Sequence, residues 1–327
     1  MTLLLTRSEV SELLDLDACI AAVESAFRLE GEGKTSPAGI LGHHVDGGGF
    51  HVKTAALGLG RPYFAAKING NFPGNRERFD LPTIQGVVVL SDAENGSLLA
   101  LIDSAEITSL RTAAATAVAA KYLARPDSRV AVICGCGRQA RAQLAALCRV
   151  LTLRKAFAYD ADANAARVFA REMEPQLGIE IAVADTLAGA LATCDVCVTC
   201  TPSTRPLIDD PEVPDGVFLA AVGADAPEKQ ELDPRLLVRA RLVVDVLDQC
   251  ASIGELHHAL EAGLLNKSDV FAELSAVVAS RKRGRDDPAD VVIFDSTGTA
   301  LEDVAAAAAL YERALAVERG LQIDLSS

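Results

Sequence analysis

The sequence predicts an α/β protein with a doubly wound parallel sheet and a second domain of α+β type. From Arg129 onward, short apolar segments alternate with helical patterns, which is typical of a parallel sheet flanked by helices. The first 120 residues lack this alternation, and their strand-like segments follow one another directly. The length of 327 residues allows about two domains of ordinary size.

The N-terminal part predicts two helices followed by a meander of strands. Residues 6–31 carry the helical patterns, with Thr6 or Ser8 as the first cap. An alanine-rich segment over 103–124 then predicts a long helix that ends at Arg125-Pro126. The strands expected between them are GFHVKTAAL, YFAAKIN, GVVVLSD and LLALID.

The C-terminal part predicts the parallel sheet. Its expected strands are RVAVIC, KAFAYD, IEIAVAD, DVCVTC, GVFLAAVG, RLVVDV and VVIFDS. Helices are expected at ANAARVFARE and over residues 138–149, 186–193, 253–262, 269–282 and 300–318. We therefore expect one domain over 121–299 and another over 1–120 that includes the closing segment 300–327.

Composition narrows the possible partners. The formal net charge of −14 argues against nucleic acid and against an anionic membrane surface, because both require a basic face. No signal peptide and no apolar stretch of membrane-spanning length is visible. Together with eight cysteines, interpreted as buried thiols in a reducing compartment, this predicts a cytoplasmic protein.

Cysteine spacing raises the question of a metal site. Cys194, Cys197 and Cys200 form C-x-x-C-x-x-C, which resembles part of an iron–sulfur ligand run. The segment also predicts a short strand, on which Cys197 and Cys200 point to opposite faces. No fourth cysteine follows at the expected spacing, so we expect no metal. The adjacent pair His43–His44 stays open as a contributor to a substrate site.

The segment RVAVICGCGRQARAQL predicts a dinucleotide site. Gly135, Gly137 and Ala140 form G-x-G-x-x-A between an apolar strand and a helix, the context in which this pattern is informative. The first glycine permits the tight turn, and the second lets the backbone approach the pyrophosphate. The helix N-terminus supplies N–H donors and a positive dipole to the phosphates. These features predict a Rossmann sheet; the alternative is a packing turn.

Asp160 indicates which dinucleotide binds. It ends the next apolar strand, 25 residues after Gly135. A carboxylate there binds both ribose hydroxyls of NAD(H) and repels the 2′-phosphate of NADP(H). We expect NAD(H), with NADP(H) as the alternative.

Two further loops lie at predicted strand ends, where such sheets bind ligands. One is Thr201-Pro202-Ser203, and the other runs from Val222 and Gly223 to Asp225. Asp225 is expected beside the nicotinamide end, as a proton-handling acid or as a surface residue.

The sequence around Lys67 is unusual for a lysine. The segment PYFAAKIN predicts a short buried strand, and the charged side chain of Lys67 is at its end. A lysine that extends its charge from a strand end to solvent is the simpler explanation. The other is a cation held ready for an anionic ligand.

Several segments in order resemble the ornithine cyclodeaminase/μ-crystallin family. They are AAKINGNFPGN, LPTIQGVVVLSDAENGSLLALIDSAEITSLRTAAATAVAAKYLA, GCGRQA, VGADAPEKQEL and DSTGTALED. The resemblance covers nearly the whole chain. It implies an NAD(P)-dependent oxidoreductase acting on α-amino or α-imino acids, and a homodimer joined through the non-Rossmann domain, which also binds substrate.

The resemblance also implies roles for particular residues. Lys67 and Arg111 match the pair that holds the substrate carboxylate, and Asp225 matches the acid near the substrate nitrogen. Cofactor positions are matched by Thr112, Gly137, Arg138, Gln139, Asp160, Thr201 and Ser296. Two fixed cations suit an α-imino acid, because they hold its carboxylate and orient its reacting carbon.

One departure affects the substrate. The family commonly has a further arginine before the meander, and here Lys53 is the replacement we expect, with His43 or His44 as alternatives. GGGFHVK and AAKINGNFPGN most resemble the Δ1-pyrroline-2-carboxylate reductase branch. The expected reaction is therefore NAD(P)H-dependent reduction of that ketimine, or of Δ1-piperideine-2-carboxylate, to proline or pipecolate. The alternatives are ornithine cyclodeaminase, an open-chain alanine- or opine-type dehydrogenase, and a μ-crystallin-like binding protein.

Overall fold

The structure, a computed structural model, describes residues 1–325. The chain divides into two compact units: unit 1 comprises 1–111 and 299–327, and unit 2 comprises 112–298. The division falls inside helix α4 (Ser104–Leu123), whereas we expected the boundary after residue 120. Among the described residues, no helix is long and apolar enough to cross a membrane.

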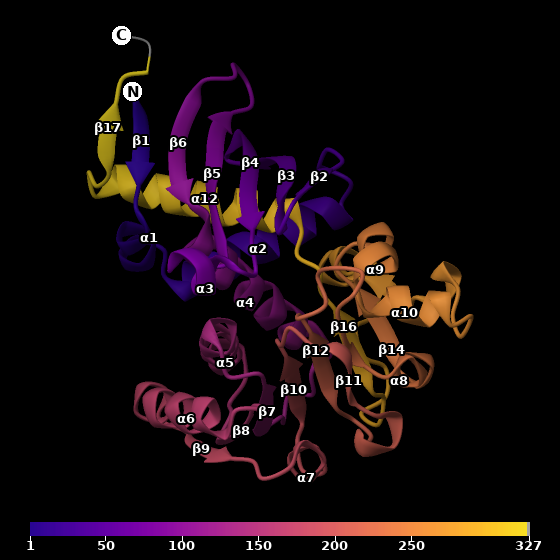
Figure 1. Cartoon of the computed structure of the whole chain (residues 1–327). Helices are drawn as coiled ribbons and strands as arrows, with labels where there is room; N and C mark the ends of the chain where they lie inside the picture. Colours follow the sequence, from indigo (N-terminus) through magenta and orange to yellow (C-terminus); the bar gives the residue numbers. More distant parts are fainter. Residues whose placement is uncertain (326–327) are drawn as a thin grey trace. The chain divides into compact units, whose positions relative to one another are not determined.

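Unit 1 is built on a seven-stranded sheet in the order β17-β1-β6-β5-β4-β3-β2, in which all pairings except β1 with β6 are antiparallel (Figure 1). Besides the start of α4, its elements are β1 (Thr2–Leu5), α1 (Arg7–Leu13), α2 (Leu16–Gly31), β2 (Gly39–Val45), β3 (Gly48–Leu59), β4 (Arg61–Asn71), α3 (Asn75–Phe79), β5 (Ile84–Asp92), β6 (Leu98–Asp103), α12 (Ala300–Ala316) and β17 (Leu321–Ile323).

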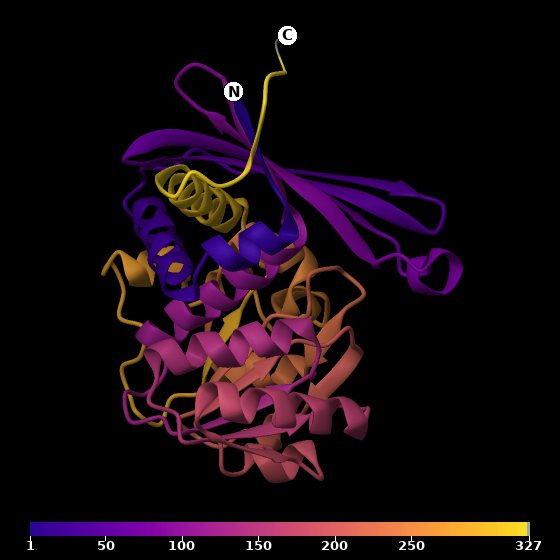
Figure 2. The same cartoon turned by 90° about the vertical axis from the view of Figure 1, so that its left-hand side faces the viewer.

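Helices α2 and α12 pack on one face of this sheet, as the yellow α12 in Figure 2 shows. Inward-facing side chains such as Ala65 and Leu90 are buried against them. The alanines of α12 are small, so the helix lies close to the strands. Of the two predicted caps, Thr6 and Ser8, Thr6 is the N-cap of α1, and it forms a capping box with Glu9. Strands β1, β2 and β17 were not foreseen.

Unit 2 contains an eight-stranded sheet in the order β15-β14-β16-β12-β10-β7-β8-β9, all parallel, and a two-stranded sheet of β11 and β13 (Figure 1). Its elements are β7 (Val130–Cys134), α5 (Arg138–Val150), β8 (Lys155–Tyr159), α6 (Ala163–Leu177), β9 (Glu180–Val183), α7 (Leu187–Leu191), β10 (Val196–Thr199), β11 (Thr204–Ile208), η1 (Asp210–Glu212), β12 (Phe218–Ala221), β13 (Gln230–Leu232), α8 (Pro234–Arg239), β14 (Arg241–Val244), α9 (Leu247–Ile253), α10 (Glu255–Glu261), η2 (Lys267–Asp269), β15 (Ala272–Glu273), α11 (Leu274–Val278) and β16 (Val292–Asp295).

The order of strands confirms the predicted α/β class with a doubly wound parallel sheet. The chain starts at β7, moves outward through β8 and β9, and returns to β10 on the other side of β7. The carboxyl ends of β7 and β10 therefore form the topological switch point, where open parallel sheets bind ligands. The Ala, Val and Ile side chains of these strands are buried and form the core of the unit.

The last two helices expected in unit 2 had different outcomes. The helix expected over 253–262 is present as α10, but it begins after Gly254, where a Cβ atom would approach Asp295 Oδ2 to 2.6 Å. The segment 269–282 was expected as one helix, but it contains the end of η2, then β15 and the short helix α11. In this second segment tertiary packing overrides a locally helical pattern.

Candidate functional site

In unit 1, two predicted cations are buried next to each other on the helix-covered face of the sheet. Lys67 lies inside β4, which continues to Asn71 rather than ending at the lysine as expected, and 4% of its surface is exposed. Arg111 lies on α4 and is 5% exposed. Lys67 Nζ is also 3.5 Å from Thr108 Oγ1, one turn before Arg111 on α4. The two cations therefore belong to one polar cluster inside unit 1.

Helix α12 supplies the acids of this cluster. Lys67 Nζ lies 2.8 Å from each carboxylate oxygen of Asp303. Arg111 Nε lies 3.0 Å from Asp303 Oδ1, and Arg111 Nη1 donates to Glu302 Oε2 at 2.8 Å. Glu302 also receives the backbone N–H of Thr299 in a capping box. Capping thus fixes the start of α12 and, with it, the partners of both cations.

The electrostatics of the cluster keep its charges close to balance. Burial, and then the neighbouring Arg111 guanidinium, lower the pKa of Lys67 to about 8 against the opposing effect of Asp303. Burial tends to raise the pKa of Asp303, yet the nearby Lys67 and Arg111 cations hold it below its ordinary value. Lys53 adds a further positive charge to the field at Lys67 and Asp303.

The structure places Lys53 beside Lys67. The two are directly opposite in the β3–β4 pairing, so their side chains lie on the same face of the sheet. Lys53 also contributes to the field at Asp303. His43 pairs with Phe50 and therefore lies on the opposite face. His44 is on the Lys53 face but further along β2, and it is exposed.

In unit 2, the glycine-rich turn has the form that a dinucleotide requires. Gly135 has a φ of +90°, and a Cβ atom there would meet Thr201 Cγ2 at 2.8 Å. Gly137 is the N-cap of α5 and makes no side-chain capping bond. No heavy atom lies within 4 Å of a Cβ built on Gly137. The absence of a side chain at Gly137 leaves open space for a phosphate at the start of α5, and the residues present fit a dinucleotide.

Asp160 follows β8 next to this turn. Its Oδ2 accepts the backbone N–H of Cys136 at 2.7 Å, and its Oδ1 accepts that of Asp162 at 2.9 Å. These bonds fix the orientation of the carboxylate at the end of the second strand. A carboxylate has further lone pairs, so it can still accept ribose hydroxyls in the way we predicted.

The predicted loops after β10 and β12 both donate hydrogen bonds to Glu231, a residue that was not predicted. Glu231 accepts hydrogen bonds from Thr201 and from the backbone of Gly223. Val222 donates its N–H to the carbonyl of Thr199 at 2.9 Å. Ser296 is tied to the same edge by its N–H bond to Ala221 O at 3.0 Å. The Ser296 hydroxyl is buried and has no hydrogen-bond partner among the described residues.

The remaining predicted residues of unit 2 lie in different surroundings. Asp225 is exposed and bonds to Lys229 Nζ at 2.5 Å. Arg138 and Gln139 open α5, where Arg138 is exposed and Gln139 half-buried. Thr112 is buried on α4. The structure thus gathers Gly135, Asp160, Thr201, Val222, Gly223 and Ser296 at the carboxyl edge of the sheet, with Asp225 in the loop beyond.

Three buried acids belong to these clusters and were not predicted. Glu302 and Asp303 look in the sequence like ordinary acids in the first turn of a helix, where they favour the helix dipole. Glu231 looks like a polar residue in a short exposed strand. A usable signal for Glu302 and Asp303 was their place in a strongly apolar helix, because buried acids require partners.

Cysteines and the surface pocket belong to other parts of unit 2. Cys194 and Cys197 are free, buried thiols. Within residues 1–325, no group of three or more His, Cys, Asp or Glu residues is arranged to hold a metal.

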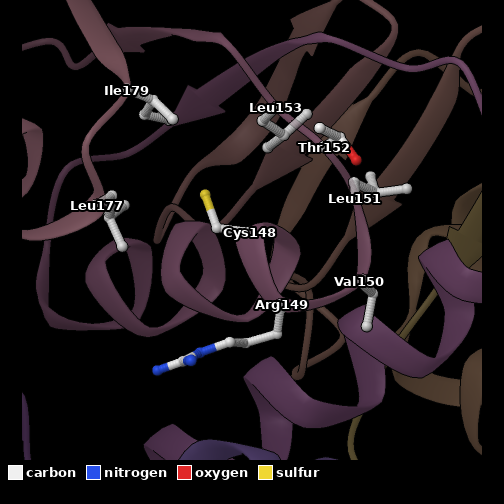
Figure 3. Close-up of a pocket in the computed structure, with 8 residues that line it drawn as sticks. All are labelled: Cys148, Arg149, Val150, Leu151, Thr152, Leu153, Leu177 and Ile179. Atoms are coloured by element: carbon white, nitrogen blue, oxygen red, sulfur yellow. The ribbon is translucent and has the colours of Figure 1, made fainter.

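Figure 3 shows a surface pocket lined by Cys148 and Leu177, at the C-terminal ends of α5 and α6. It is about one helix length, roughly 20 Å, from the glycine-rich turn.

Comparisons with known proteins find one family over nearly the whole chain. The family model described as "Ornithine cyclodeaminase/mu-crystallin family" matches residues 1–318. An alanine dehydrogenase from Archaeoglobus fulgidus is 40% identical over 322 residues, which is 98% of each chain.

Two solved structures are similar over nearly the whole chain. An archaeal alanine dehydrogenase dimer with bound NAD has a TM-score of 0.93 and 40% identity, with 99% of each chain covered. The Δ1-pyrroline-2-carboxylate reductase of Thermococcus litoralis, in complex with NADH and L-proline, has a TM-score of 0.90 and 31% identity. That match covers 98% of this chain and 100% of the other.

Proposed function

The chain belongs to the ornithine cyclodeaminase/mu-crystallin family, and on that premise we propose that it reduces the C=N bond of a cyclic α-imino acid with NADH. It is an NAD-dependent oxidoreductase acting on amino or imino acids, as its relatives are. The first substrate we propose is Δ1-pyrroline-2-carboxylate, with the six-membered Δ1-piperideine-2-carboxylate as its homologue.

The observation that carries this proposal is the buried cluster of Lys67, Arg111 and Asp303. Two adjacent cations in a desolvated setting suit one substrate carboxylate, and hydrogen bonds to charged groups are stronger than neutral ones. Because Asp303 and Glu302 hold the cations from α12, the ammonium and the guanidinium are positioned before a ligand arrives. Less orientational freedom is then lost on binding.

The residues of unit 2 supply the other half of the proposed reaction. The first turn of α5 would hold the pyrophosphate, Asp160 the adenosine ribose, and the loops at Thr201 and Gly223 the nicotinamide half. When bound, reduced nicotinamide supplies a hydride to the imine carbon. Asp225 is proposed to stabilise the positive charge of the protonated imine. In the free protein Lys229 holds this acid in place.

Alanine formation is a second candidate, because the Archaeoglobus fulgidus alanine dehydrogenase is 40% identical over almost the full length. Reductive amination of pyruvate passes through an open-chain α-imino acid with the same carboxylate and C=N groups. Lys67, Arg111 and the dinucleotide residues would then have the same roles. The two reactions differ in the second substrate, ammonia, and in the size of the group attached to the imine carbon.

The test follows absorbance of the reduced nicotinamide band in the purified protein. We expect NADH to be consumed stoichiometrically with Δ1-pyrroline-2-carboxylate, and proline to appear. Consumption only with pyruvate plus ammonia would replace the cyclic substrate by the open-chain one. Proline and ammonia formed from ornithine with catalytic NAD+ would indicate a cyclodeaminase. If NADH binds but no substrate is turned over, the reductase proposal is wrong, and the remaining interpretation is a protein that binds NADH without catalysing a reaction.

We also propose a homodimer formed through the open face of the unit 1 sheet. Strand β4 turns Phe64, Ala66 and Ile68 away from α12, and Phe64 and Ile68 are 36% and 39% exposed. Val87 and Val89 of β5 continue this apolar face. An apolar patch of this kind marks an interaction surface, and the archaeal alanine dehydrogenase is a dimer.

A further inference from the structure

Four buried carboxylates form a continuous chain of hydrogen bonds through the carboxyl edge of the unit 2 sheet. They are Glu231, Glu255, Asp295 and Asp245, each no more than 1% exposed. Buried carboxylates are costly unless their oxygens are hydrogen-bonded. Here each one accepts N–H groups from a neighbouring loop or helix start, which favours the charged form, whereas burial raises the pKa of Glu231, Glu255 and Asp295.

Glu231 is the member nearest the predicted cofactor loops, and all four of its bonds go to the ends of β10 and β12. Oε1 accepts the backbone N–H of Thr201 at 2.6 Å and its hydroxyl at 2.7 Å. Oε2 accepts the hydroxyl of Thr199 at 2.7 Å and the backbone N–H of Gly223 at 2.9 Å. One carboxylate therefore connects two loops that are 22 residues apart in the chain.

The approach of these loops is too close for a side chain at Gly223. A Cβ atom there would lie 2.4 Å from Thr201 O and 2.5 Å from Glu231 Oε2. Glycine at position 223 therefore allows the backbone of the loop after β12 to pack against the Glu231 carboxylate, which also binds the loop after β10. Substituting a neutral amide for this carboxylate removes an acceptor, because an NH2 group cannot accept from an N–H donor.

The rest of the chain fixes Glu231 itself. Glu255 accepts the backbone N–H groups of Glu231 and Leu232 at 2.7 and 3.1 Å. Asp295 accepts the N–H groups of Glu255 and Leu256 at 3.1 and 2.9 Å.

Beyond Asp295, the same pattern reaches the loop that contains Ser296. The backbone of Asp295 accepts the N–H of Asp245 at 3.1 Å. Asp245 Oδ2 in turn accepts the N–H groups of Thr297 and Gly298 at 2.7 and 2.6 Å. The loops after β10, β12, β14 and β16 are therefore held in one network.

We infer that Glu231 is a positioning residue for the nicotinamide half of the dinucleotide. The inference rests on the proposed function, and on the strand order that places the adenosine half at β7 and β8 and the nicotinamide half over β10 and β12. By holding Thr201 and Gly223 together, Glu231 fixes the two backbones that would face the nicotinamide. None of the four carboxylate bonds described above goes to the glycine-rich turn or to Asp160.

The test is Glu231→Gln in the full-length protein, with two ligands compared by calorimetry. NADH contains the nicotinamide, whereas ADP-ribose contains only the adenosine, the pyrophosphate and the second ribose. We expect the Kd for NADH to rise about tenfold, the size of one lost charged hydrogen bond, while the Kd for ADP-ribose stays within about twofold. Circular dichroism establishes that the variant is folded.

Two controls make the result specific. Glu174→Gln removes a carboxylate that accepts the backbone N–H of Ile181 at 2.9 Å, far from the predicted loops, and should change neither affinity. Thr199→Val removes one of the four bonds at constant size, and should weaken NADH binding about threefold, whereas Thr199→Ser should not. These variants keep the inference testable if Glu231→Gln does not fold.

Equal losses for NADH and ADP-ribose in Glu231→Gln, or no loss for NADH, would overturn the inference. So would a Thr199→Val protein that binds NADH like the wild type. Binding is measured without turnover, so the outcome is separate from the proposed function. If the wild type consumes no NADH with any imino acid, the reaction is wrong, while the difference between the two ligands still tests Glu231.

Discussion

At the scale of single residues, the charge of Lys67 is the property on which the proposed function depends most. The structure places this lysine beside its expected partner Arg111, which with burial lowers its pKa to about 8, and beside Asp303, which was not predicted and opposes that change. A surface lysine would stay charged over the whole physiological range. Lys67 instead changes charge just above neutrality, and this makes its role measurable.

The pH dependence of the reaction is the first prediction. Lys67 loses its proton as the pH rises through about 8, and a neutral amine no longer attracts the substrate carboxylate. We therefore expect kcat/KM for the imino acid to be highest below about pH 8 and to fall above it. The measurement is a pH profile of kcat/KM, with NADH saturating at each pH.

Two variants decide whether that fall belongs to Lys67. In Lys67→Arg the cation stays protonated, so the decline near pH 8 should disappear even if the rate is lower. Asp303→Asn removes the carboxylate that raises the pKa of Lys67, so the decline should move to lower pH. A decline that stays near pH 8 in both variants would assign it to another group.

At the scale of elements, strand ends and helix starts carry the chemistry. The start of α5 provides the glycine-rich turn, the end of β8 provides Asp160, and the start of α12 provides Glu302 and Asp303. Part of this was predictable, because G-x-G-x-x-A and the acid after the next strand form a local pattern. The acids of α12 were not predictable, because their partners Lys67 and Arg111 lie about 190 to 240 residues away in the chain.

Cofactor choice is the prediction that belongs to this scale. Asp160→Ala should lower the preference for NADH over NADPH by about tenfold, because the carboxylate that binds the ribose hydroxyls and repels a 2′-phosphate is gone. The measurement is the ratio of kcat/KM values for the two cofactors with the same imino acid.

A neighbouring acid provides the matched control. Asp162 is the N-cap of α6 and accepts the N–H of Asn164 at 2.9 Å, so Asp162→Ala should affect stability and leave the cofactor ratio unchanged. A wild-type protein that already prefers NADPH would contradict the assignment of Asp160, as would the same shift in both variants.

At the scale of the whole molecule, the remaining prediction concerns assembly. Phe64→Asp combined with Ile68→Asp places two charges on the apolar face of unit 1, and burying unpaired charges in an interface is strongly unfavourable. We expect the double variant to be a monomer where the wild type is a dimer, by light scattering coupled to size-exclusion chromatography.

Val238→Asp is the control for assembly. Val238 lies on α8 of unit 2 and is 51% exposed, so the same change of chemistry should leave the dimer intact. A wild-type monomer would refute the homodimer. A Phe64→Asp, Ile68→Asp protein that is still a dimer would place the interface elsewhere, for example at the edge strands of the sheet.

The sequence by itself determined the doubly wound class, the glycine-rich turn and the acid that follows it, because each depends on neighbours within a few tens of residues. It also singled out Lys67 through its apolar setting, and the resemblance to the family paired it with Arg111. Only the tertiary structure decided which acids pair with Lys67 and Arg111. The partners of Lys67 come from α12, and Glu231 joins two loops that no local pattern connects. Buried charges take their partners from wherever the fold brings them, so their identity is a property of packing rather than of spacing.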